Sequence, residues 1–202
     1  MIKNQFPLQH VSKLKRNLPQ RDFLIVGKGP SLKGWSDSFH DQFNVVGINH
    51  VAEKLKTTIG HFTDYETFST QKWLSPNVIV SGMMNQQLKT TVTLPYLIQN
   101  NLAFADLYKS NRVYTYDIRT DAFDTNLFAM RRPLVFKYAS GVLLTQVAII
   151  WNLSRMYTLG IDGGTNYHHD FSELRGNGLF LNDQITLMNE FARNNSLEII
   201  KM

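Results

Sequence analysis

The string Gly-Lys-Gly-Pro-Ser-Leu at residues 27–32 directly follows the apolar run 23–26. Such a run, bounded by Gly and Pro, predicts a buried strand, and Ser31 predicts the N-cap of a following helix. Gly27 and Gly29 permit a sharp turn and close approach of a ligand to the backbone. A strand-to-helix turn also presents N–H groups and a positive dipole end that suit a phosphate. We therefore predict a nucleotide-binding turn, with Lys28 adding a cation and Pro30 completing the string; an ordinary turn is the alternative.

The elements needed to position this turn alternate along the chain. We expect strands at 22–26, 44–48, 60–63, 77–81, 112–116, 155–159 and 197–200, and helices at 51–56, 67–73, 95–108, 141–153 and 182–194. Residues 1–20 predict an N-terminal helix or arm, whereas 117–137 and 163–181 are expected to be irregular. Alternating strands and helices predict an α/β fold of the modified Rossmann-like kind, a mainly parallel sheet with helices on both faces, as a single domain over 1–202.

The composition narrows the class of protein. With 43% hydrophobic and 18% charged residues, the chain is expected to be a soluble globular protein. It has no cysteine, which excludes disulfides and thiolate zinc sites. No apolar stretch approaches the length of a membrane span, and the N-terminus lacks a signal-peptide core. We therefore predict a cytoplasmic protein.

The net charge of +5 favours anionic partners. Aromatic and basic residues are not interleaved as in RNA-binding motifs, so no nucleic-acid partner is predicted. Peripheral contact of the basic N-terminal arm with an anionic inner membrane is an open alternative. A homo-oligomer is also left open by the sequence.

The ends of the expected strands select further candidates, because ligands of open α/β sheets bind beyond the carboxyl ends of the strands. The positions selected by this rule are Asn49 and His50, Asp64 and Tyr65, residues 81–85 beginning with Ser81, and residues 160–162 ending with Asp162. Each of them alone could simply end a strand or form a turn. Together with the turn at 27–31 they predict one binding edge.

Four segments resemble a known family in their order and spacing. They are similar to segments of the bacterial CMP-sialic-acid-dependent sialyltransferases of the Campylobacter type. The four segments are the string at 27–32, Val-Gly-Ile-Asn at 46–49, Ser-Gly-Val at 140–142, and Leu-Gly-Ile-Asp at 159–162 with a tyrosine downstream. The resemblance spans about residues 22–200. More distantly, the first string resembles the 6-hydroxymethylpterin pyrophosphokinase-like family.

The sialyltransferase resemblance implies inverting transfer of a nonulosonic sugar from a CMP donor to an oligosaccharide or glycolipid acceptor, with no metal and no cofactor. It implies that residues 27–31 and Tyr167 contact the nucleotide phosphate, and that Asn49 and Asp162 contact the base or ribose. Ser140 and the Gly141 amide would bind the sugar carboxylate, and Lys137 stands where the family carries an arginine. The chain has no Asp-x-Asp pair for a metal.

Two departures from the family concern catalysis. Lys28 replaces the family's asparagine, and residues 176–181 contain no histidine where the family carries its general base. His168 and His169 are the candidate bases, beside Tyr167, because imidazole accepts a proton near neutrality. An exposed loop with no catalytic role is the alternative for this pair.

Two rival functions are therefore kept. One is a pterin pyrophosphokinase-like enzyme using ATP and Mg²⁺, which needs carboxylates near the phosphates; Asp64 and Asp162 are its candidates. The other is a non-catalytic nucleotide-binding protein that keeps the fold.

Overall fold

The computed structural model describes residues 8–63, 75–81, 102–116, 118–119, 134–135, 140–164, 166–172 and 181–202. Within them lies an eight-stranded sheet in the order β1-β6-β5-β4-β3-β2-β9-β10, and all neighbouring strands are parallel. The strands are β1 (Gln9–His10), β2 (Asp22–Val26), β3 (Phe43–Ile48), β4 (Ile59–Phe62), β5 (Asn77–Val80), β6 (Val113–Thr115), β9 (Arg155–Leu159) and β10 (Glu198–Lys201). The parallel α/β fold expected from the sequence is confirmed.

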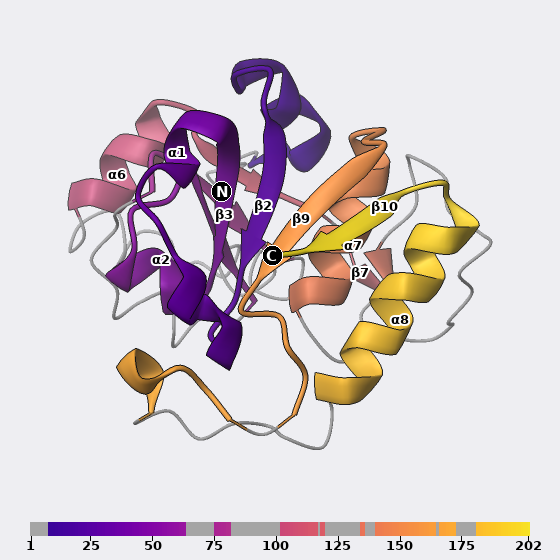
Figure 1. Cartoon of the computed structure of the whole chain (residues 1–202). Helices are drawn as coiled ribbons and strands as arrows, with labels where there is room; N and C mark the ends of the chain where they lie inside the picture. Colours follow the sequence, from indigo (N-terminus) through magenta and orange to yellow (C-terminus); the bar gives the residue numbers. More distant parts are fainter. Residues whose placement is uncertain are drawn as a thin grey trace.

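Helices cover both faces of this sheet (Figure 1). The α-helices are α1 (Phe39–Gln42), α2 (Val51–Lys54), α6 (Leu102–Lys109), α7 (Ser140–Ile150) and α8 (Leu181–Asn194), and the 3₁₀ helices are η1 (Val11–Asn17), η2 (Pro30–Gly34) and η3 (His169–Phe171). Helices α7 and α8 lie on the opposite side of the sheet from α1, α2 and α6. No helix among the described residues is long and apolar enough to span a membrane.

The central strand β2 shows why this sequence needs two helical layers. Phe23 and Ile25 pack in a core that contains α7 and α8 side chains, whereas Leu24 and Val26 pack in a separate core with η2 and α2 side chains. A parallel strand covered on both faces is apolar throughout rather than alternating. Helix α7 is itself buried along its length except at Ile149, as expected for a helix that is apolar on every side.

Some differences from the expected elements follow from segment length. Within the predicted N-terminal arm, residues 9–10 form the edge strand β1 and residues 11–17 form η1, while residues 1–7 lie outside the described residues. Strands β7 (Ile118–Arg119) and β8 (Leu134–Val135) pair within a stretch expected to be irregular, and η3 lies in the other one. Elements of two or three residues are too short to show a periodicity. The expected helix at 67–73 and the start of the helix at 95–108 lie outside the described residues.

Candidate functional site

A polar network joins the carboxyl ends of β3, β4 and β5 to the start of α7, and Thr63 is its centre. The Asn49 Nδ2 donates to the Thr63 Oγ1 at 3.3 Å, and the Thr63 N–H donates to the Asn49 Oδ1 at 3.2 Å. The Ser81 hydroxyl donates to the Thr63 carbonyl at 3.0 Å, and the Ser140 hydroxyl lies 3.5 Å from the Thr63 Oγ1. Three predicted site residues thus meet at one residue that sequence reasoning missed.

Thr63 could have been found from its position. It is the last residue of the expected strand at 60–63, but β4 ends at Phe62, so Thr63 is the first residue beyond the carboxyl end of the strand. Asn49 has a positive φ of 48°, a conformation that Asn tolerates better than most residues. Its side-chain oxygen already accepts from the Thr63 N–H, and its contact with a nucleotide stays a prediction.

The predicted phosphate turn packs against the segment that follows β9. The N–H groups of Gly27 and Gly29 donate to the carbonyls of Leu159 and Gly160, both at 2.8 Å. The Ser31 N–H donates to the Asp162 carboxylate at 2.7 Å. These three N–H groups therefore have acceptors within the protein. A phosphate at this turn would have to be held mainly by side chains.

Glycine at residues 27 and 160 allows this close contact. A Cβ on Gly27 would lie 2.4 Å from the Gly160 carbonyl oxygen, and a Cβ on Gly160 would lie 2.3 Å from the Gly27 carbonyl oxygen. Gly160 also has a φ of +69°, which favours glycine. The sequence correctly marked a tight backbone approach, but the partner that approaches is the β9 segment.

Ser31 has a different role from the one expected. The N-cap of η2 is Gly29, so the prediction that Ser31 caps the helix is wrong. Pro30 takes the first helical position, which its fixed φ favours, and this places Ser31 inside the helix. The Ser31 hydroxyl instead accepts from the Gly160 N–H at 2.8 Å.

Asp162 connects the turn to the last strand. Its carboxylate accepts from the Ser31 N–H and pairs with the Lys201 Nζ at 2.9 Å, with 13% of its side chain exposed. Burial acts to raise the pKa of Asp162, but the hydrogen bonds from Ser31 and Lys201 outweigh burial and hold this pKa below its ordinary value. Asp162 is therefore a structural carboxylate whatever it contacts in a ligand.

Lys28, Tyr167 and His168 come together beside the same turn. The His168 N–H donates to the Lys28 carbonyl at 2.7 Å. The Lys28 Nζ lies over the Tyr167 ring, 4.8 Å from its centroid. The structure thus brings a predicted phosphate-binding cation next to a predicted phosphate-binding tyrosine and a candidate base.

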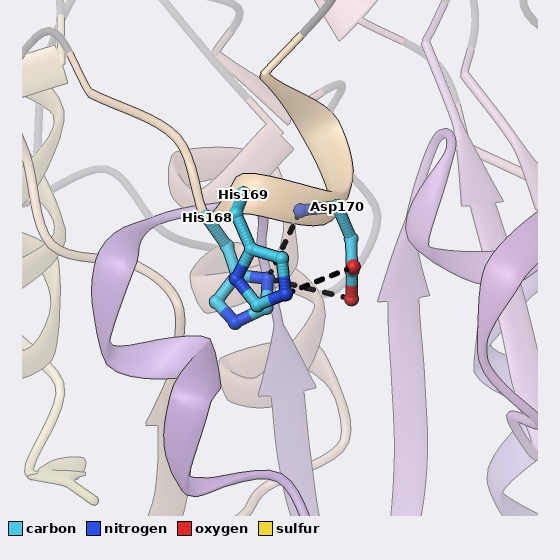
Figure 2. A group of neighbouring side chains, drawn as sticks. All are labelled: His168, His169 and Asp170. Carbon is cyan, nitrogen blue, oxygen red and sulfur yellow. Dashed lines mark hydrogen bonds and ion pairs between the residues drawn. The ribbon is translucent and has the colours of Figure 1, made fainter.

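The histidine pair faces a carboxylate (Figure 2). The His168 Nδ1 lies 3.5 Å from one Asp170 oxygen, and the His169 Nε2 lies 3.2 Å from the other. The side chain of His168 is 11% exposed and that of His169 is 82% exposed. A carboxylate beside an imidazole can orient it as a base, and the same atoms could hold a divalent cation.

The remaining candidates and one buried histidine divide into three cases. Gly141 starts α7 beside Ser140, but its N–H donates to the Gln184 Oε1 at 3.0 Å, so this amide already has an acceptor in the protein. His61 of β4, which is not among the predicted site residues, is fully buried and bonded to the Tyr116 hydroxyl at 2.7 Å, a structural position. Lys137 and the pair Asp64 and Tyr65 lie outside the described residues.

Comparison with known proteins reveals a similar fold at low sequence identity. A structure of a variant of the sialyltransferase Cst-II in complex with CMP matches 90% of this chain and 81% of its own, with 15% identity and a TM-score of 0.50. A structure of CstII from Campylobacter jejuni with the substrate analogue CMP-3FNeuAc matches the same shares, with 16% identity and a TM-score of 0.49. No protein-family model and no curated protein sequence matches the chain. The chain therefore has the α/β fold of a sialyltransferase that has been seen with CMP bound.

Proposed function

We propose that this protein is a sialyltransferase-like glycosyltransferase, transferring a nonulosonic sugar from a CMP donor to an oligosaccharide or glycolipid acceptor. The observation that carries the proposal is the meeting of Lys28, Tyr167 and His168 beside the turn after β2. This cluster lies beyond the carboxyl ends of parallel strands, where ligands of such sheets bind. The fold shared with the CMP-bound sialyltransferase also supports this proposed function.

In this proposal Lys28 and Tyr167 hold the donor phosphate. The backbone N–H groups of Gly27, Gly29 and Ser31 donate within the protein, so a mobile cation and a phenol must meet the phosphate charge. The Lys28–Tyr167 contact is worth about 0.5–1 kcal/mol at an exposed site. A hydrogen bond between an ammonium and a phosphate is worth roughly 1.5–3 kcal/mol. Lys28 would therefore leave the ring for a bound phosphate.

The network centred on Thr63 is proposed to hold the nucleoside and sugar. Asn49 and Ser81 offer amide and hydroxyl groups for the nucleoside, while Ser140 lies at the N-terminus of an eleven-residue helix. The positive end of that helix dipole favours the sugar carboxylate. Since the Gly141 N–H donates to Gln184, the Ser140 hydroxyl is the proposed contact, with Lys137 as its cationic neighbour.

One of the two histidines is proposed to accept the acceptor hydroxyl proton. Asp170 faces both rings and can orient either of them. The proton moves from the attacking hydroxyl to the imidazole as the new glycosidic bond forms and CMP leaves. The proposed transfer step requires no metal, because Lys28 and Tyr167 meet the leaving-group charge.

Nucleotide binding tests the first half of the proposal. Calorimetry with CMP in the presence of EDTA should show binding, and Lys28→Ala should weaken it roughly tenfold, the loss of one charge-assisted hydrogen bond. Lys33→Ala is the matched control, since Lys33 is an exposed lysine of η2. Binding of ATP with Mg²⁺ but not of CMP would instead favour the pyrophosphokinase-like rival.

Transfer itself is tested with CMP-sialic acid and a panel of sialylable oligosaccharides and glycolipids. His168→Ala and His169→Ala are assayed separately, and the variant lacking the base should lose about a hundredfold or more in kcat. Full transfer by both variants would contradict the assignment of the base. CMP binding without any transfer would leave the non-catalytic rival as the better function.

A further inference from the structure

His168, His169 and Asp170 direct three potential metal ligands toward one another (Figure 2). One ligand atom from each residue lies within 4.8 Å of the other two. The imidazole centroids are 4.0 Å apart, and the rings are tilted by 41°. Among the described parts of the chain, this set is the group of such residues that could hold a metal ion.

The separations fit a small divalent ion. Ligand atoms about 2.0–2.2 Å from zinc in a tetrahedron lie roughly 3.3 Å from one another. The two histidine–aspartate separations are 3.5 and 3.2 Å. Rotation of the His169 ring, which is 82% exposed, can shorten the separation between the two imidazole nitrogens at little cost in packing. The His168 Nδ1 also accepts from the Asp170 N–H at 3.4 Å. A three-ligand site therefore forms when the His169 ring rotates and the ion replaces this long hydrogen bond.

The backbone that carries these ligands is fixed by the fold. The His168 N–H donates to the Lys28 carbonyl at 2.7 Å, and the Phe171 N–H donates to the His168 carbonyl at 2.9 Å. Phe171 is 1% exposed, in the core with η2 and α2 side chains. The Lys54 Nζ donates to the Asp170 carbonyl. Ordering these residues during folding lowers the entropic cost of binding an ion later.

We infer that His168, His169 and Asp170 form a binding site for one divalent transition-metal ion, with zinc the best fit. Two imidazoles and a carboxylate suit zinc and its neighbours in the first transition row, whereas Mg²⁺ and Ca²⁺ prefer oxygen ligands. Three protein ligands leave a fourth position open to water or another ligand. The inference does not rest on the proposed transferase activity. An ion on one ring nitrogen leaves the proton on the other nitrogen of a neutral imidazole, so a loaded site inhibits any transfer in which this pair acts as the base.

Metal binding by the full chain, with any histidine tag removed, tests the inference. Titration calorimetry with Zn²⁺ in the absence of nucleotide should show one ion per chain and far weaker binding of Mg²⁺. His169→Ala and Asp170→Asn should each lower the zinc affinity tenfold or more. His10→Ala is the matched control, because His10 is an exposed histidine that contacts Ser12 instead, and it should bind zinc as the unchanged chain does.

Cobalt(II) gives a second readout of the same ligands. Its visible spectrum on the unchanged chain should indicate mixed nitrogen and oxygen ligation, and His169→Ala should remove that signal. His169 and Asp170 are exposed, so both variants should keep the circular dichroism of the native fold. Equal zinc affinity in the unchanged chain and in both variants would overturn the inference, and so would Mg²⁺ binding as tightly as Zn²⁺. Neither result bears on CMP binding, which is measured separately in EDTA.

Discussion

At the scale of single residues, the glycine spacing of the turn after β2 is recognisable in the sequence, but the group that contacts these glycines is not. The spacing at 27–32 indicates a backbone that something must approach closely. The approaching group is the Gly160 carbonyl, 133 residues along the chain from Gly27 by sequence number. A local pattern contains no information about such a distant neighbour. Ser31 was misjudged for the same reason, because its hydroxyl bonds the Gly160 N–H.

Alanine substitutions at two glycines with similar backbone conformations distinguish the cost of backbone strain from the cost of a steric clash. Gly160 and Gly164 have φ values of +69° and +72°, but a Cβ would clash only at Gly160, with nothing within 4 Å at Gly164. Gly164→Ala should cost about 1–2 kcal/mol of unfolding free energy from the left-handed backbone alone. Gly160→Ala should cost clearly more, because two backbones must separate. Urea unfolding measures both, and equal losses would contradict a tight contact between the β2 and β9 segments.

His61 gives the fold a dependence on pH. Burial lowers the pKa of His61 from its ordinary value of 6.5 to about 3. The unfolded chain therefore takes up a proton below about pH 6.5 that the folded chain refuses until about pH 3. Stability should be full above pH 6.5 and fall as the pH drops, by up to about 1.4 kcal/mol per pH unit.

Substitution of His61 tests this dependence through the slope of unfolding free energy against pH rather than through the free energy at one pH. His61→Gln should flatten the decline in unfolding free energy between pH 6.5 and 4, even if the variant is less stable throughout. His10→Ala, at an exposed histidine, should keep the slope of the unchanged chain. An unchanged slope in His61→Gln would mean that another group causes the decline.

At the scale of elements, the long apolar strands were predictable and the short ones were not. Strands β2 and β9 have the bounds expected from their apolar runs, and the other central strands differ by a residue or so at an end. The short helices and the contacts within the site depend on packing between elements, which the sequence pattern does not show. Gly-Pro-Ser suggested a strand-to-helix turn, yet Pro30 begins only the 3₁₀ helix η2. The site centre, Thr63, is the partner of side chains from three other elements and has no sequence motif of its own.

Asp162 joins three elements, and acid should weaken that connection. Its pKa is held below the ordinary value in the folded chain. The stability it contributes is therefore present above pH 3.8, the unperturbed value, and is lost as the pH falls through the folded pKa. Asp162→Asn should be less stable than the unchanged chain at pH 7, and the difference should shrink in strong acid.

Unfolding in urea at pH 7 and at pH 3 and below measures this difference. Asp41→Asn, at an exposed carboxylate of α1, is the control and should change stability little at either pH. A deficit for Asp162→Asn that stays constant with pH would show that the contacts of Asp162 do not depend on its charge.

At the scale of the whole molecule, the sheet separates two helical layers with distinct cores. Phe191 of α8 and Phe104 of α6 are both 0% exposed and belong to different cores. Phe191→Leu and Phe104→Leu should each cost roughly 1–2 kcal/mol through lost packing. Because the two residues share no core partners, the double variant should equal the sum within about 0.5 kcal/mol. A larger coupling energy in urea unfolding would mean that the sheet transmits strain between its faces.

The ion pair between Lys201 and Asp162 also has a practical consequence for handling the protein. Lys201 lies at the end of β10, and its partner Asp162 accepts from the Ser31 N–H of the turn after β2. The end of β10, beside β9 in Figure 1, is thus linked through Asp162 to the turn of the proposed donor site. A purification tag placed after Met202 would emerge next to that site, and its histidines would compete for any metal added. Such a tag should therefore be removed before CMP or a metal ion is titrated.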